Sequence, residues 1–266
     1  MTAMEYAGGK MLASVADGVG TATFNQPEKR NAISVAMWRG FADILDAFAD
    51  PAVKVVVLTG AGSKAFVSGA DISEFETMRG DADAQQEYDR QTSEGRAKLA
   101  GFAKPMIARI EGFCLGGGLN IAMQADMRVA ADNALFGAPA AKIGNVYGLE
   151  MARKLVSLVG PAHTRMLLYT GSRIDAAVAE RIGLVNRVVP AAELDGVIAE
   201  MARAISENAP LSVRAHKLVI NEAVKDASER DLPGVRAAME ACLNSADYRE
   251  GRAAFMQKRP PQFTGQ

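Results

Sequence analysis

The fold of this 266-residue chain is decided by the stretch Glu111-Gly-Phe-Cys-Leu-Gly-Gly-Gly-Leu-Asn120. It follows an apolar run, Pro105-Met-Ile-Ala-Arg-Ile110, which has the length of a buried strand. We expect a helix to begin at about Gly117 or Gly118, where the first turn presents N–H groups without partners and a partial positive charge. The stretch lacks the glycine spacings of phosphate-binding and dinucleotide-binding loops. Glycines after a strand also serve tight turns and close packing, so the stretch alone leaves both roles open.

A second glycine-rich joint lies upstream and reads Gly60-Ala-Gly-Ser-Lys-Ala-Phe-Val-Ser-Gly-Ala-Asp-Ile-Ser-Glu-Phe75. It leaves a β-branched run over Val53–Leu58, which predicts another buried strand. The small residues at Gly69 and Ala70 let backbone N–H groups approach a ligand closely. If the two joints face each other, their N–H groups can bind one oxygen that becomes negative in a reaction, which is an oxyanion hole.

The rest of the chain alternates strand and helix patterns before it becomes helical. A hairpin is expected over Leu12–Asn25, and a helix capped by Ser34 should end before Pro51. A third short strand is expected over Met127–Ala130. This succession predicts an α/β domain with both sheet faces covered. From Pro161 on, the pattern is almost wholly helical, so we expect a core over residues 1–190 and a helical region over 191–266.

Composition restricts the class of protein. Hydrophobic residues make up 49% of the chain and charged residues 23%, which is ordinary for a globular protein. The net charge of −1 argues against a general nucleic-acid binder. Two cysteines and two histidines can form neither a disulfide framework nor a zinc site. Because no signal region or apolar run of membrane-spanning length is visible, we expect a cytoplasmic protein that has no membrane partner.

The two joints, in this order and separation, resemble the crotonase superfamily, also called the enoyl-CoA hydratase/isomerase family. Further matching segments run along nearly the whole chain: Phe24-Asn-Gln-Pro-Glu-Lys-Arg-Asn-Ala32, Gly69-Ala-Asp-Ile72, Phe136-Gly-Ala-Pro139, Leu168-Tyr-Thr-Gly171, Ala179-Glu-Arg-Ile-Gly-Leu-Val185 and Glu250-Gly-Arg-Ala-Ala-Phe255. The resemblance implies a spiral of ββα units and a C-terminal helical region that forms a homotrimer or a dimer of trimers. It implies an enzyme, a lyase of that family, whose substrate is an acyl-CoA thioester.

The resemblance also implies a binding site for that thioester. Its carbonyl would sit between the N–H groups of Ala70 and Gly117, where an enolate is stabilised. The substrate path would be lined by Ala70, Asp71, Ile72, Ser73 and Leu115. Cations near the CoA phosphates would be Lys29, Arg30, Lys64 and, from a neighbouring subunit, Lys258. No metal and no redox cofactor is expected, and coenzyme A enters only as part of the substrate.

The sequence departs from the family at the two positions where its hydratases carry catalytic glutamates. These positions hold Asn120 and Ala140, and neither side chain can accept a proton near neutral pH. Tyr147 and Glu150 remain as candidate acid, base or nucleophile. We therefore expect a hydratase-like protein whose reaction is atypical. The alternatives are a catalytically silent acyl-CoA binder, or a decarboxylase, thioesterase, dehalogenase or isomerase on the same scaffold.

Overall fold

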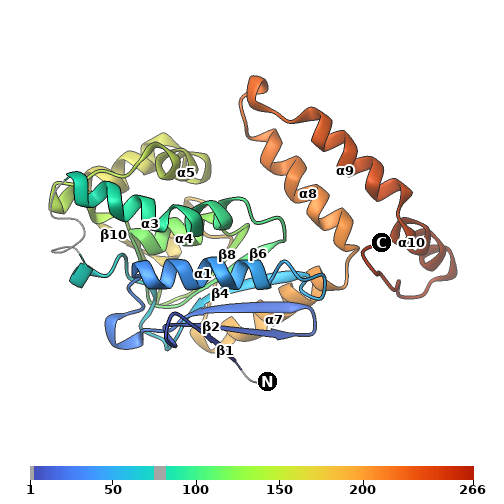
Figure 1. Ribbon diagram of the computed structural model, residues 1–266, viewed down its shortest axis with the longest axis horizontal. Coiled ribbons are helices and arrows are strands. Elements are labelled where there is room, and N and C mark those ends of the chain that lie inside the picture. Colours follow the sequence, from blue (N-terminus) through green and yellow to red (C-terminus); the bar gives the residue numbers. More distant parts are fainter. Residues whose placement is uncertain (1–2, 75–81) are drawn as a thin grey trace.

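The computed structural model describes residues 3–74 and 82–266, and it contains two sheets with helices around them (Figure 1). The strands are β1 (Met4–Tyr6), β2 (Met11–Ala16), β3 (Val19–Phe24), β4 (Val55–Gly60), β5 (Ala65–Val67), β6 (Met106–Ile110), β7 (Phe113–Leu115), β8 (Met127–Ala131), β9 (Leu135–Gly137), β10 (Arg173–Asp175) and β11 (Arg187–Val189). The helices are α1 (Val35–Ala47), α3 (Ala82–Ala100), α4 (Gly117–Gln124), α5 (Leu149–Thr170), α6 (Ala176–Arg181), α7 (Leu194–Ser206), α8 (Pro210–Ala223), α9 (Leu232–Asn244) and α10 (Ala246–Gln257).

The strands alternate between the two sheets along the chain. Among the described residues, seven strands form one sheet in the order β1-β2-β3-β4-β6-β8-β11, and four form the other in the order β10-β9-β7-β5. Each of β4, β6 and β8 belongs to the larger sheet, and the strand that follows it belongs to the smaller one. A helix then leads to the next unit, so the chain winds as a spiral of ββα units. The expected α/β class is confirmed.

The first elements form as their sequence predicts. The hairpin β2–β3 turns at Asp17 and Gly18, which both have positive φ. Ser34 caps α1 by accepting a hydrogen bond from the Met37 N–H at 3.3 Å. The apolar stripe of α1 is buried under the larger sheet. The strand expected over Val53–Leu58 begins two residues later and ends at Gly60.

Both faces of the larger sheet are covered. One face packs against α1 and α4 and forms the main hydrophobic core with them. The other face is covered by α7, whose Leu194, Val197 and Ile198 pack on Val55 and Val57 of β4. The apolar stripe that the sequence shows in α7 is therefore used against the sheet. By contrast, α8, α9 and α10 extend away from the α/β body, as Figure 1 shows at the right.

The expectation of an almost wholly helical chain after Pro161 is wrong in two places. Strand β10 pairs with β9, and strand β11 pairs with β8. Each has three residues, which is too short for a clear periodicity, and each is stabilised by a neighbouring strand far away in sequence. Within the described residues, no helix is long and apolar enough to cross a membrane.

Candidate active site

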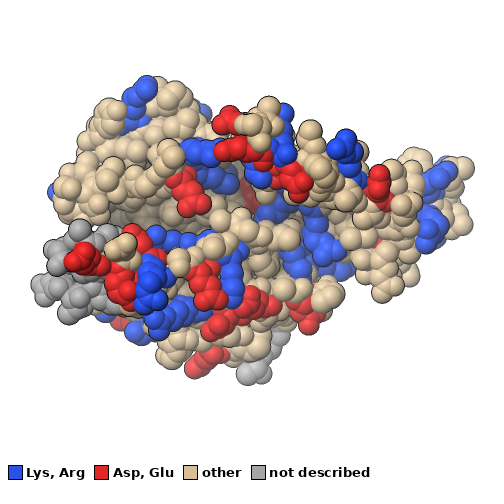
Figure 2. Space-filling model, turned by 45° about the horizontal axis from the view of Figure 1, so that its top comes forward, with Lys and Arg blue, Asp and Glu red and all other residues tan. Residues whose placement is uncertain are grey.

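A cavity of about 510 Å³ lies where the two glycine-rich joints meet. Its walls come from α1, α3, α4 and the segment that leads into α5. Five of the residues expected to act on the substrate line it: Ala70, Gly117, Asn120, Tyr147 and Glu150. Figure 2 shows a hollow in this part of the surface, with side chains of both charges around it. The fold therefore gathers most of the expected catalytic residues into one space.

The backbone of Ala70 is oriented by an isolated parallel bridge with Ile33. The Ile33 N–H donates to the Gly69 carbonyl at 2.8 Å, and the Asp71 N–H donates to the Ile33 carbonyl at 3.0 Å. This bridge uses the groups on either side of Ala70 and leaves the Ala70 N–H out of the pairing. No acceptor for that N–H is recorded among the described residues.

Gly117 is the first residue of α4 and faces Ala70 across the cavity. A Cβ atom placed on Gly117 would lie 3.8 Å from the Ala70 nitrogen. The first N–H groups of a helix have no intrahelical partner, so the Gly117 N–H is available to a ligand. Two N–H groups from separate joints thus lie beside one small space. This is the arrangement that stabilises a developing oxyanion.

Tyr147 lies next to this pair. Gly116 has φ +52°, and a Cβ atom there would lie 3.2 Å from the Tyr147 hydroxyl oxygen. The Gly116 N–H donates to the Gly137 carbonyl at 2.9 Å, which fixes the turn before α4. Glu150 is exposed in the first turn of α5, where its charge also complements the helix dipole.

Asn120 stands one helical turn beyond Gly117. Its Oδ1 atom is buried and has no hydrogen-bond partner among the described residues. A buried acceptor without a donor is costly, so this amide is suited to a bound ligand or water. Ala140 is buried in the short turn Pro139–Ile143 and is not among the residues that line the cavity.

Asp71 forms a local network instead of facing solvent. Its carboxylate accepts hydrogen bonds from Lys29 Nζ at 2.9 Å and from the Ser73 hydroxyl at 2.7 Å. Burial alone would raise the pKa of Asp71, but the hydrogen bonds from Ser73, Lys29 and Gln26 outweigh it and lower the pKa to about 2. This network stabilises the turn that follows Ala70, because the Asp71 carboxylate also accepts a hydrogen bond from the Ser73 N–H at 3.0 Å. It also shows that Lys29 is already paired with a carboxylate.

We expect Asp71 to make stability depend on acidity. Its folded pKa of about 2 lies below the ordinary value of 3.8, so the carboxylate stabilises the fold above pH 3.8 and this contribution is lost as pH falls toward 2. The loss amounts to roughly 2 kcal/mol. Urea unfolding at pH 5 and pH 2.5 should show a smaller drop for Asp71→Asn than for the wild type. Asp17→Asn, at an exposed turn residue, should leave the decrease in the free energy of unfolding between the two pH values as it is in the wild type. An equal decrease in both variants would contradict the role given to Asp71.

Basic side chains gather around Phe113 at the start of β7. The guanidinium carbons of Arg30 and Arg173 each lie 5.1 Å from the centre of the Phe113 ring. The Lys64 carbonyl accepts a hydrogen bond from the Phe113 N–H at 3.0 Å, which places Lys64 beside the same residue. The guanidinium of Arg30 and the backbone of Lys64 therefore lie beside the same residue.

The remaining expected residues lie elsewhere. Leu115 is buried in β7, and the side chain of Ile72 lies outside the part of the chain that the structure describes. Lys258 ends α10 in a left-handed conformation. Figure 1 places α10 at the opposite end of the molecule from α5, so Lys258 cannot reach this cavity within one chain.

Sequence reasoning missed Arg173, Arg96 and Gln124. Gln124 lines the cavity one turn beyond Asn120, and this spacing could have identified it. Arg96 lines the cavity from α3, and Arg173 reaches Phe113 from β10. Neither position is visible in sequence, because each depends on how distant elements pack.

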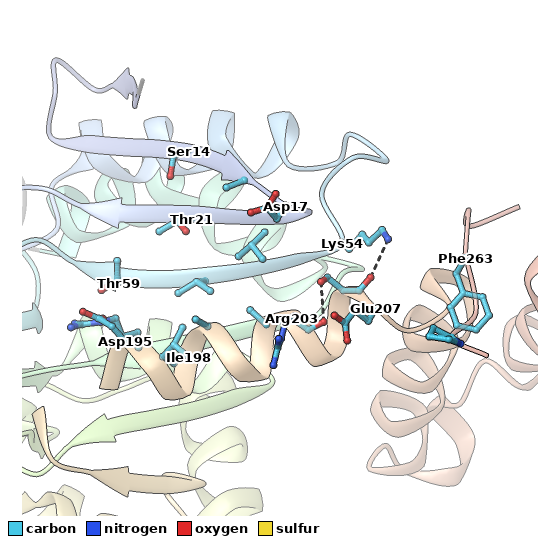
Figure 3. A pocket seen from close by; sticks show the side chains of 18 of the residues that line it. Ser14, Asp17, Thr21, Lys54, Thr59, Asp195, Ile198, Arg203, Glu207 and Phe263 are labelled. Atoms are coloured by element: carbon cyan, nitrogen blue, oxygen red, sulfur yellow. Dashed lines mark hydrogen bonds and ion pairs between the residues drawn. The ribbon is translucent and has the colours of Figure 1, made fainter. Parts of the chain in front are cut away.

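A larger hollow of about 1410 Å³ lies on the other side of the larger sheet, between the sheet, α7 and the C-terminal tail (Figure 3). Two of its cations are already engaged: Lys54 donates to the Ser206 carbonyl at 3.0 Å, and Arg109 pairs with Asp195 and Glu111. It contains neither of the N–H groups described above. Of the two cavities, only the smaller one is lined by Ala70 and Gly117.

Comparison with known proteins agrees with this geometry. The family model described as enoyl-CoA hydratase/isomerase matches residues 14–266. The chain is 36% identical over 240 residues to a crotonyl-CoA hydratase of Syntrophomonas wolfei, covering 90% of this chain and 92% of that protein. It is 35% identical over 252 residues to a short-chain-enoyl-CoA hydratase of Clostridium acetobutylicum, with coverages of 91% and 92%. A crystal structure of an enoyl-CoA hydratase/carnithine racemase from Magnetospirillum magneticum has a TM-score of 0.90 at 36% identity, with coverages of 97% and 96%.

Proposed function

Because the chain belongs to the enoyl-CoA hydratase/isomerase family, we propose that it binds an acyl-CoA thioester in the smaller cavity and stabilises the enolate between the N–H groups of Ala70 and Gly117. The single observation that carries this proposal is the pair of N–H groups from two joints beside one space. As the thioester becomes an enolate, negative charge develops on its oxygen. Each positioned donor contributes about 3–4 kcal/mol to such a transition state.

The reaction itself differs from ordinary hydration. Addition of water across a double bond needs groups that accept and donate protons, and a positioned acid or base contributes about 10²–10⁴-fold. Asn120 can hold a water molecule or donate a hydrogen bond, but it cannot take a proton near neutral pH. Tyr147, beside the N–H pair, is placed to donate a proton to the enolate, and Glu150 is the base or nucleophile.

The basic side chains around Phe113 support the coenzyme A part of the substrate. Arg30, Lys64 and Arg173 offer positive charge at the edge of the smaller sheet, and phosphates are anions that arginine binds with two parallel hydrogen bonds. Lys258 of a neighbouring protomer completes this set in an assembled protein. No metal or redox cofactor takes part in the proposed chemistry.

The C-terminal helices support assembly into a homotrimer or a dimer of trimers. None of the residues of α9 is buried, and Met239 and Leu243 are each more than half exposed. Phe255 and Met256 of α10 are 83% and 81% exposed. Apolar helix faces of this size are normally covered by another chain. Light scattering should give a multiple of three chains, and a monomeric mass would contradict the assembly.

The function is tested by two measurements on one preparation. Calorimetry with butyryl-CoA tests binding, and loss of enoyl absorbance with crotonyl-CoA tests hydration. We expect binding with little hydration. The next step would then be to test substrates for decarboxylation and for thioester hydrolysis. Strong hydration would show that other groups replace the two missing carboxylates, and Glu150→Gln should then remove it. Absence of binding to any CoA ester would overturn the proposal, whereas binding without any turnover would favour a silent acyl-CoA binder.

A further inference from the structure

The smaller cavity has a polar side that an unsubstituted fatty acyl chain would not use. Along α4 the cavity is lined in turn by Gly117, Asn120 and Gln124. These positions are three and four residues apart, so they share one face of the helix. At 1.5 Å per residue, Gln124 lies about 10 Å along the axis from Gly117. A chain that starts at the N–H pair and follows α4 therefore meets two amides in succession.

The Oδ1 atom of Asn120 is buried and has no hydrogen-bond partner among the described residues. Gln124 lines the same cavity one helical turn further along α4. Buried polar groups are nearly always hydrogen-bonded in folded proteins. The unpartnered Asn120 Oδ1 atom, with the Gln124 amide on the same cavity wall, points to a ligand that carries hydrogen-bonding groups along its chain.

Arg96 adds a positive charge to the same cavity. Its guanidinium carbon lies 5.8 Å from the Trp38 ring and 5.7 Å from the Tyr88 ring, which hold it in place. Its recorded ion-pair partner is Asp89, with Nη1 and Oδ1 3.1 Å apart. The two side chains are 40% and 50% exposed, so this pair contributes little and can be exchanged. A guanidinium has five N–H donors, and one bond to Asp89 leaves the others for a ligand.

We propose that the acyl group of the substrate ends in a carboxylate that binds Arg96, so that the substrate class is the CoA monothioester of a short dicarboxylic acid. This inference rests on the proposed function, because it places the thioester at Ala70 and Gly117. Arg96 binds the far carboxylate, and the amides of Asn120 and Gln124 line the chain between the two ends. An apolar acyl chain of equal length would leave the buried Asn120 Oδ1 atom without a partner and would offer the free N–H donors of Arg96 no acceptor.

The test compares glutaryl-CoA with pentanoyl-CoA, which have acyl chains of equal length and differ in the terminal carboxylate. Calorimetry on the wild type should show glutaryl-CoA binding about tenfold more tightly or better, as expected for a charge-assisted hydrogen bond. Equal or weaker binding of glutaryl-CoA would overturn the inference and leave the proposed function standing. If neither ester binds, the proposed function itself fails.

Variants separate the role of Arg96 from a general effect of charge. Arg96→Met keeps the stem between the two rings and should reduce the preference to less than about twofold, with pentanoyl-CoA binding retained as evidence of folding. The matched control is Arg90→Met on the same helix, because Arg90 pairs with Glu87 and does not line the cavity. The control should keep the full preference. Asp89→Asn removes the carboxylate that competes for Arg96 and should increase the preference for glutaryl-CoA over pentanoyl-CoA. If that preference survives in Arg96→Met, the inference is contradicted.

Discussion

Gly117→Pro should reduce the ability of the protein to stabilise an enolate by about 100-fold or more, because it removes one of the two N–H donors. The readout does not depend on which reaction the protein catalyses. Bound acetoacetyl-CoA ionises to an enolate that absorbs in the near ultraviolet, so its ionisation constant can be measured by titration. The wild type should favour the enolate strongly, and the variant should lose most of that effect.

Proline suits this position, which makes the test specific. Gly117 is the first residue of α4, where an N–H has no helical partner and where proline is well tolerated. Gly116 precedes it with φ +52° and ψ −113°, an extended conformation of opposite hand that only glycine adopts readily. Leu149→Pro is the matched control, since Leu149 is the exposed first residue of α5. Equal enolate absorbance in wild type and Gly117→Pro would refute the oxyanion hole.

The sequence predicts the parts of the fold that rest on local patterns. The hairpin over β2 and β3, the cap of α1 at Ser34 and the start of α4 at Gly117 all follow from turn residues, capping residues and periodicity within a few positions. The two glycine-rich joints could also be assigned to one site, because parallel strands that leave the same sheet carry their following loops to the same edge.

Features that depend on long-range packing could not be predicted in this way. Strands β10 and β11 are defined by pairing with β9 and β8 and have almost no pattern of their own. Arg96 enters the cavity because α3 packs on α1, where the ring of Trp38 meets the guanidinium. The position of Trp38 in the sequence does not reveal this contact, because Arg96 lies far away along the chain.

Gly118→Ala should destabilise the fold by about 3 kcal/mol or more, a large effect for a single methyl group. A Cβ atom on Gly118 would lie 2.0 Å from the carbonyl oxygen of Val67 and 2.7 Å from its carbonyl carbon. Both contacts are with the backbone of β5, so no side chain can rotate away. Either α4 or β5 therefore has to move. Urea unfolding at a fixed protein concentration should show a much lower midpoint for Gly118→Ala than for the wild type.

The neighbouring glycine provides the control for this effect. A Cβ atom on Gly117 would meet nothing closer than 3.8 Å, which is an ordinary contact, so Gly117→Ala should change the free energy of unfolding by no more than about 1 kcal/mol. The two variants add the same methyl group to adjacent residues of the same helix turn. Helix propensity favours alanine over glycine at both positions, so a similar loss of stability in both variants would contradict the assignment of the effect to the contact between Gly118 and β5. A stable Gly118→Ala would show that α4 does not pack this closely on β5, and the joint that places the Gly117 N–H would then need a different explanation.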